Sequence, residues 1–382
     1  MTKAKSLLIL AMFLWVCSCV EPFSASFDKN SIILTVDATL TDLDEQQTIK
    51  IFESTSYSGS TYANPVLKAK VELLVDNKDK IAFTEGTGGV YSLPASFRTK
   101  QGSSYQLFIQ RADGRQYQSG KETLIKVADI TKVYDEFVLK GVPRGNDYDP
   151  ANYVYIDTPD PANEKNNYMW SWKLWEKQSV CTTCQNGRYQ KTGTSKQPPG
   201  CREEKGYENT QFDYYCDGNC WDLFFNRDLN VFSDIYSNGN TITGKLVAKI
   251  PYYQVDGSLI EIKQQSISPE AYRYMKLIAD QVQNSGGLVD TPPAALIGNV
   301  KNMSDDNEAV AGFFMVTSIK KVKYWISRNN AYNKAMPVGL LDHTIVLEPS
   351  GTGELDRPPL VPCIESNTRT KIKPEGWVDT VR

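Results

Sequence analysis

The residues of this chain that are best placed to do chemistry are five cysteines close together in the sequence. They are Cys181, Cys184, Cys201, Cys216 and Cys220, with CxxC and CxxxC spacings at the two ends. Such a set can hold a zinc ion through thiolates, carry out redox chemistry, or crosslink a long loop. The compartment decides between these uses, because disulfides persist only in an oxidising environment.

The start of the chain indicates export from the cytoplasm. Two lysines precede an apolar run from Leu7 to Val16, which is shorter than the roughly 20 residues that span a bilayer. This layout predicts a secretory signal peptide over residues 1–18. Cys19 follows a small residue and has an aliphatic residue three places before it, as in a bacterial lipobox. We therefore predict lipidation at Cys19, with an ordinary signal peptide without lipid as the alternative.

Cleavage before Cys19 removes two lysines and lowers the formal charge from −3 to −5. A modestly acidic protein has no electrostatic reason to bind nucleic acid. Residues 19–29 are expected to be a lipid-anchored tether, and no later stretch approaches membrane-spanning length. Acyl chains are therefore the only predicted membrane attachment, and more than one chain anchors a protein firmly.

In an oxidising envelope the remaining cysteines are expected to form disulfides. Apart from Cys17 and Cys19, the chain keeps an even number of thiols, which are the five above and Cys363. Because five thiols cannot all pair among themselves, Cys363 is predicted to bond to one of them. A zinc site is the open alternative, although it would leave two thiols unused. A thioredoxin-like use of CxxC is disfavoured because no βαβ pattern surrounds Cys181.

The segment 178–220 has little apolar material with which to hold itself together. It is rich in Gly, Thr, Lys and Gln and contains a Pro-Pro pair. Each disulfide in it is expected to contribute about 3 kcal/mol by restricting the unfolded chain. We predict a disulfide-stapled loop that projects from the domain, and projecting loops often carry binding surfaces.

Few other residues favour catalysis. The one histidine, His343, lies in a strand-like run, and the sequence contains no GxSxG, HExxH, Walker or GxGxxG motif. Paired carboxylates remain open because acidic residues are numerous. The acidic run at residues 304–308 lacks the oxygen pattern of a calcium loop and is predicted to be a solvated turn. We expect no enzymatic activity, no cofactor and no metal.

The tryptophans at 170, 172 and 175 raise the question of a carbohydrate platform. Trp170, Trp172 and Leu174 alternate, however, so that they share one face of a strand. This arrangement is typical of a sheet core, and we predict that the tryptophans belong to the core.

The elements that must position these residues are mainly β-strands. Apolar and polar residues alternate over residues 34–41, 69–75 and 105–109, and turn residues follow the second and third of these runs. This pattern predicts an amino-terminal antiparallel β-sandwich, Ig-like or prealbumin-like, over residues 30–130.

A larger β-rich domain is predicted over residues 131–382. It contains one strong helix at residues 269–285, where Ser268 can cap the first amides and Pro269 suits the first helical position. Ala271, Met275, Ile278 and Val282 are expected to form its packed face.

Motifs in a fixed order resemble a known family. LTVDATLTD, VELLVDN and GVYSLP come first, and then SPEAYRYMK, GNVKN, GFFMVTS and CIESNTRTKIKPEGW. Together they resemble the Bacteroidota outer-membrane lipoproteins catalogued as domain of unknown function 4249. The resemblance implies a lipid-anchored outer-membrane protein, facing the periplasm or the cell surface and often encoded near a TonB-dependent receptor. It implies no established reaction.

From this resemblance we expect a non-enzymatic accessory of an outer-membrane β-barrel, most plausibly a TonB-dependent receptor, that helps to capture or admit a ligand. The alternative is a structural subunit of a complex that assembles or matures outer-membrane proteins. A third hypothesis, an enzyme that acts on glycan or peptide, is the least favoured.

Overall fold

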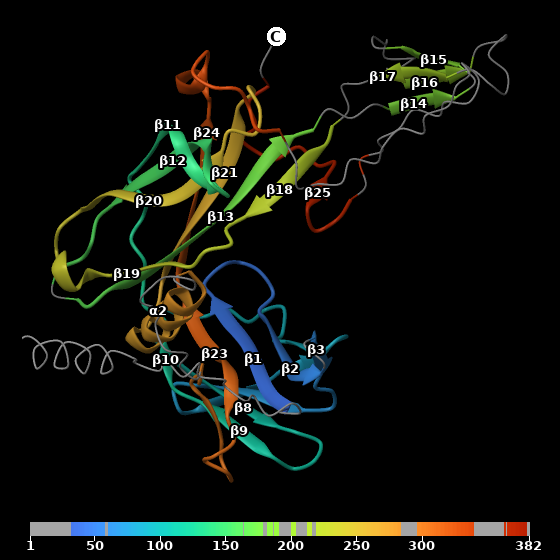
Figure 1. The fold of residues 1–382 in the computed structure, drawn as a ribbon. Coiled ribbons are helices and arrows are strands. Elements are labelled where there is room, and N and C mark those ends of the chain that lie inside the picture. The colour runs from blue at the N-terminus through green and yellow to red at the C-terminus, as the bar shows by residue number, and fades with distance from the viewer. Residues whose placement is uncertain are drawn as a thin grey trace, which may run out of the picture.

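The computed structural model of the 382-residue chain has two β-rich domains and a Cys-rich extension (Figure 1). It describes residues 32–57, 60–162, 164–178, 182–185, 187–190, 200–203, 212–215, 219–283, 296–339, 363 and 365–379. The predicted signal peptide, the tether with Cys19, and His343 lie outside these residues. The prediction of a mainly β fold with a sandwich and a second, larger β-rich domain is confirmed.

Two sheets form the first sandwich, and its core lies between them. One sheet has the order β23-β1-β2-β7-β6, with β3 also paired to β2; its strands are β1 (Ile32–Thr41), β2 (Thr48–Tyr57), β3 (Ser60–Pro65), β6 (Thr84–Glu85), β7 (Val90–Ser92) and β23 (Val310–Thr317). The other has the order β22-β9-β8-β4-β5, with β10 paired to β8; its strands are β4 (Lys70–Val75), β5 (Asp79–Ala82), β8 (Ser104–Gln110), β9 (Gln116–Ser119), β10 (Glu122–Thr123) and β22 (Val300–Asn302).

The predicted alternation is confirmed in β1, where Leu34, Val36, Ala38 and Leu40 are all buried. The turn between β8 and β9 contains an Asp-Gly pair, and its Gly114 has a φ of 92°, which a residue without a Cβ adopts at little cost. Local sequence therefore sets both the buried face of the strand and the position of the turn.

The predicted division at residue 131 is wrong for two strands of the sandwich. β22 and β23 come from residues 300–317, far beyond the predicted boundary, and their residues Val300, Val310 and Phe314 belong to the sandwich core. β23 pairs in parallel with β1, from Leu34↔Val310 to Thr41↔Thr317. The sandwich is therefore not wholly antiparallel. Parallel strands need a long connection, and so the partner of β1 comes from a distant part of the chain.

The second domain packs a three-stranded sheet against a larger one. The first has the order β11-β12-β20, with β11 (Lys132–Arg144), β12 (Asp147–Thr158) and β20 (Ile242–Pro251). The second has the order β24-β21-β13-β18-β25, with β19 also paired to β13; its strands are β13 (Asn167–Lys177), β18 (Trp221–Phe225), β19 (Asn230–Ser233), β21 (Ser258–Ser266), β24 (Ile319–Ile326) and β25 (Arg369–Thr370). Two short 3₁₀ helices, η2 (Asp234–Tyr236) and η3 (Asn329–Ala331), lie in connections.

Helix α2 (Pro269–Gln283) occupies the predicted position, and residues 284–285 lie outside the described residues. The Ala271 amide donates to Ser268 Oγ at 3.1 Å, as expected of an N-cap. Ala271 is fully buried against Phe313 and Met315 of β23. Val282 is 69 % exposed, however, so the predicted packed face is wrong at its last position. The buried positions of the helix extend from Ala271 to Ala279.

The chain passes directly from the sandwich to the second domain at Ser318. This residue alone separates β23 from β24. Ser318 Oγ donates to one carboxylate oxygen of Asp42 at 2.6 Å, and the Ile319 amide donates to the other at 2.8 Å. Since Thr41 is paired with Thr317 beside this crossing, the Ile32 end of β1 points away from the second domain. Ten strand residues separate the two ends by roughly 30 Å.

The predicted loop 178–220 contains paired strands. β14 (Thr182–Gln185) pairs with β17 (Phe212–Tyr215), and β15 (Gly187–Gln190) pairs with β16 (Gly200–Glu203), so one hairpin is nested inside the other. We call β14 to β17 the Cys-rich extension. Figure 1 shows it beyond the ends of β13 and β18, on the far side of the second domain from the sandwich.

Candidate functional site

The cysteine prediction can be followed for part of the set. Cys363 forms a disulfide with Cys220, as the odd number of thiols in the loop predicts; their Cα atoms are 5.7 Å apart, and both residues are buried. Cys184 lies on β14 and Cys201 on β16. Cys181 and Cys216 lie outside the described residues, so the pairing of these four stays a prediction.

The disulfide belongs to a compact group that we call the loop base, which contains Glu176, Asp222, Arg328, Arg369 and the Cys220–Cys363 bond. Arg369 lies on β25, which pairs with β18 and adds the carboxyl-terminal tail to the sheet. Its Nε donates to Asp222 at 2.6 Å, and both side chains are almost fully buried. The Cys-rich extension thus begins and ends on a part of the sheet that is fixed covalently and electrostatically.

A second ion pair joins Glu176 of β13 to Arg328, and both side chains are 0 % exposed. Arg328 Nη1 donates to Glu176 Oε2 at 3.0 Å and to the carbonyl of Asp256 at 2.8 Å. Arg328 has a φ of 59°, in a region that residues other than Gly seldom adopt. A buried charge needs a close partner, and the Arg328 guanidinium is the partner of the Glu176 carboxylate.

Glu176 and Asp222 are directly opposite one another on β13 and β18, and sequence alone left such carboxylate pairs open. Two carboxylates about 5 Å apart suit a retaining glycosidase. Here, each carboxylate is fully buried and bonded to its own arginine. Both carboxylates are therefore structural groups of the loop base, and their full burial keeps a substrate from reaching them.

The tryptophans contribute to the core as predicted. Trp170 is 1 % exposed, and Trp172 packs against the same core from a half-buried position. Trp175 belongs to a second cluster with Trp221 beside the loop base. The carboxyl-terminal tail closes that cluster through Trp377, whose ring centroid lies 5.7 Å from that of Trp221.

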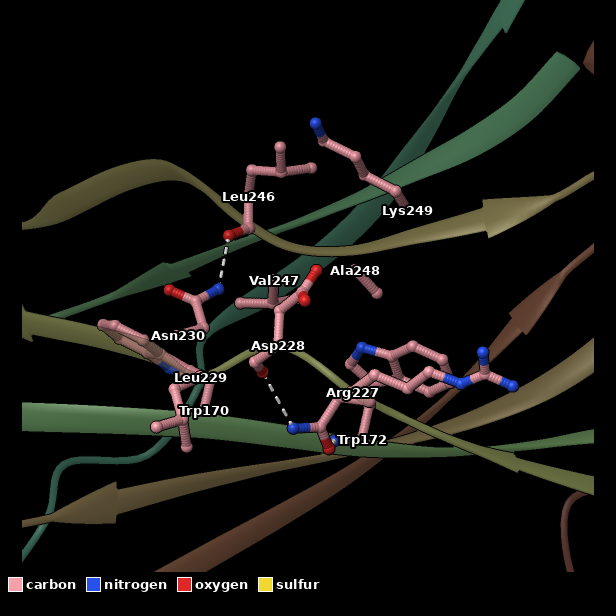
Figure 2. A pocket seen from close by; sticks show the side chains of 11 residues that line it. Trp170, Trp172, Arg227, Asp228, Leu229, Asn230, Leu246, Val247, Ala248 and Lys249 are labelled. Carbon is pink, nitrogen blue, oxygen red and sulfur yellow. Dashed lines mark hydrogen bonds between the residues drawn. The ribbon is translucent and has the colours of Figure 1, made fainter. Parts of the chain in front are cut away.

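A pocket opens beside Trp172 at the edge of the second domain. β18 and β19 both pair with β13, but the residues from Asn226 to Leu229 leave the sheet between them. The gap between this turn and β20 has a volume of about 230 Å³ and is shown in Figure 2. Sequence reasoning missed this pocket, because it arises where two strands share one neighbour.

Hydrogen bonds fix the turn that forms the pocket. Asn226 Oδ1 accepts from the Trp172 amide at 3.0 Å, and its Nδ2 donates to the Asp228 carbonyl at 3.1 Å. Asn230 Nδ2 donates to the Leu246 carbonyl of β20 at 2.9 Å. Figure 2 shows the last two bonds as dashed lines, with the Asp228 side chain directed toward β20. The pocket is thus preformed.

Two buried ionisable side chains outside the pocket and the loop base have shifted pKa values. Lys245 of β20 lies over the Trp170 and Phe232 rings at 5.0 and 5.3 Å, and burial lowers the pKa of its ammonium group. Burial raises the pKa of Glu122 to about 7 at the contact between the sandwich and α2. Ser268 Oγ donates to one Glu122 oxygen at 3.1 Å.

A larger cavity of about 690 Å³ lies where the two domains meet, lined by residues 101–102, 123–128, 161 and 164–166. The predicted solvated turn at residues 304–308 is confirmed: it joins β22 to β23, with Asp305 and Asp306 exposed.

Within the described ranges there is no group of three or more potential metal-ligating side chains. No helix in those ranges is long and apolar enough to cross a membrane.

Comparisons with known proteins give one match. No curated protein and no solved structure matches the chain. The family model described as Domain of unknown function (DUF4249) matches residues 20–323. The match spans both domains and reaches past β23, which the sandwich needs in order to be complete. The chain therefore belongs to the DUF4249 family.

Proposed function

We propose that this protein is a lipid-anchored accessory of an outer-membrane β-barrel, with Cys19 as its anchor and a TonB-dependent receptor as its partner in ligand uptake. In this proposal it works by contact and not by catalysis. The partner binds the second domain and the Cys-rich extension. The sandwich holds these parts away from the membrane.

The observation that carries the proposal is the order of the parts along the molecule. The Ile32 end of β1 is the described point nearest in sequence to Cys19, and it points away from the second domain. Figure 1 shows the Cys-rich extension at the opposite end of the molecule from the sandwich. An anchor at one end and a projecting element with a disulfide at its base suit a protein that reaches from a membrane to a partner.

Two places along this path are held by short or cross-linked connections. Only Ser318 separates the two domains at the β23–β24 crossing, and the extension starts from the disulfide and the two ion pairs of the loop base. A contact surface on a fixed support loses less conformational entropy on binding than one on a flexible linker.

The experiment is affinity purification of the tagged protein from gently solubilised outer membranes, followed by identification of the proteins that co-purify. The test variant replaces residues 191–199 by Asn-Gly. Gln190 and Gly200 are directly opposite in the β15–β16 pair, so a two-residue hairpin turn can join them. The change keeps every cysteine and should weaken recovery of the barrel.

A Gly-Ser insertion after Gly114, in the β8–β9 turn of the sandwich, is the matched control and should leave recovery unchanged. Full recovery with the shortened extension would show that the contact lies elsewhere. Growth phenotypes then separate two roles. Loss of growth on one nutrient supports uptake, whereas a general defect in outer-membrane protein content supports a subunit of an assembly complex.

A further inference from the structure

The pocket beside Trp172 is separate from the loop base and from the Cys-rich extension. It lies on the face of β13 that points into the second domain, between the 226–229 turn and β20. This turn leaves the sheet while β18 and β19 continue on either side of it. The edge of the second domain is therefore open at one place.

The volume limits what the pocket can hold. At about 230 Å³ it is smaller than the roughly 300–1,000 Å³ of pockets that enclose a drug-sized molecule or a cofactor. It has room for a single ring, and the rest of a longer ligand would extend into solvent through the open edge.

One wall of the pocket is a flat apolar surface. Trp172 is only partly buried, whereas the neighbouring Trp170 is 1 % exposed and donates from Nε1 to Gln264 at 2.9 Å. Part of the Trp172 indole is therefore exposed at the pocket, where a ring with an apolar face could stack against it.

Two side chains at the rim, Asp228 and Asn230, offer hydrogen-bond acceptors. The amide nitrogens of Asn226 and Asn230 already donate to backbone carbonyls. In the part of the chain that the structure describes, no hydrogen bond engages the carboxylate of the exposed Asp228 or Asn230 Oδ1. A ligand that satisfies this rim must bring donors, such as hydroxyl groups.

The charges near the pocket do not provide a clear partner for an ionic ligand. The Asp228 carboxylate at the rim repels an anion. The Lys249 ammonium lies over the Tyr153 ring at 5.2 Å, on the outer face of the three-stranded sheet and not in the pocket. A neutral ligand carries no charge that must be desolvated on entering the pocket.

We propose that this pocket binds one ring of a neutral saccharide, with the apolar face of the sugar against Trp172 and its hydroxyl groups donating to Asp228 and Asn230. The inference deepens the proposed function, because it names the class of ligand that the receptor partner would admit. It does not require that partner for binding.

The test uses the purified full-length protein in detergent and a panel of hexasaccharides derived from starch, cellulose, xylan, β-1,3-glucan and mannan. Tryptophan fluorescence and saturation-transfer NMR measure binding. Polygalacturonate and chitosan oligomers serve as anionic and cationic probes. We expect at least one neutral hexasaccharide to bind and the charged oligomers to bind more weakly.

Trp172→Ala should weaken the binding of the neutral hexasaccharide about tenfold or more. Asp228→Ala is a second variant at an exposed turn position, which leaves the core intact, and should also weaken binding. Phe225→Ala is the matched control: Phe225 is 48 % exposed and lies on the opposite face of the same sheet, so binding should be unchanged.

The absence of binding by every neutral hexasaccharide at millimolar concentration would overturn the proposal. So would unchanged affinity in both pocket variants, or tighter binding of a charged oligomer. The barrel co-purification assay on Asp228→Ala separates the two proposals. Retained barrel recovery with lost sugar binding supports this site, whereas failure to recover any barrel from the unaltered protein contradicts only the proposed partnership.

Discussion

The two ends of the second domain are held by different interactions. At the sandwich end, β23 continues into β24 through Ser318, and hydrogen bonds from Ser318 and Ile319 to Asp42 fix the crossing. At the loop base, a disulfide and two buried arginine–carboxylate pairs hold strands that are distant in sequence. One end depends on chain continuity, and the other on covalent and ionic links.

This difference indicates that the interactions of the loop base fix its geometry more than they increase its stability. Buried ion pairs contribute little net stability, because desolvation offsets their attraction. Three atoms near the loop base, Arg328 Nε, Trp221 Nε1 and Ser258 Oγ, are buried without a hydrogen-bond partner in the described structure, which is a further cost. The loop base therefore fixes the strand ends from which the Cys-rich extension leaves the sheet.

The largest effect is expected for Arg328→Met. It leaves the Glu176 carboxylate fully buried without its counter-ion, which should lower the free energy of unfolding by about 3–5 kcal/mol. Urea unfolding followed by circular dichroism measures it. The double variant Glu176→Gln/Arg328→Met should recover part of the loss. Arg273→Ala, which removes an exposed helix pair, is the control. A cost below about 1 kcal/mol would show that the pair is not needed.

The next largest effect is expected for Cys220→Ala/Cys363→Ala, which should cost about 2–5 kcal/mol. The loss should be local, since the bond ties the tail to β18 near the extension. Hydrogen exchange should increase in β18 and β25 and remain unchanged in β1. Equal loss of protection in both domains would contradict the separation of the two ends.

Glu122→Gln tests how the stability of the sandwich end depends on pH. The folded-state pKa of Glu122 is raised from 4.5 to about 7, first by burial, so the folded protein retains a proton that the unfolded chain releases between these values. Stability should therefore fall as pH rises from about 4.5 through 7, by on the order of 3 kcal/mol. Glu122→Gln should remove this component of the pH dependence. Parallel stability–pH curves for the two proteins would refute the assignment.

The smallest effect is expected for Asp42→Ala. This carboxylate accepts two hydrogen bonds at the crossing between the domains, but it is itself exposed. We expect a cost of about 1 kcal/mol, measured as a small shift in thermal unfolding. Asp37→Ala, at an exposed position of β1, the strand that precedes Asp42, is the control and should cost less.

The amino-acid sequence by itself determined the local features. Alternation identified the buried residues of β1, and Ser268-Pro269 marked the start of α2. The odd number of thiols in the loop predicted that Cys363 bonds back to it. Each of these features depends on neighbouring residues or on the arithmetic of one residue type, so no tertiary contact was needed to infer it.

Only the tertiary structure decided which distant segments meet. β1 pairs with β23, although nearly 280 residues separate Thr41 from Thr317; Arg328 neutralises Glu176 from 152 positions away; and the pocket forms where β18 and β19 share β13. A period-2 pattern states that one face of a strand is buried, but not which segment covers it. That choice depends on the packing of the whole chain, which also turned a predicted loop into nested hairpins and completed the sandwich with residues far beyond its predicted end.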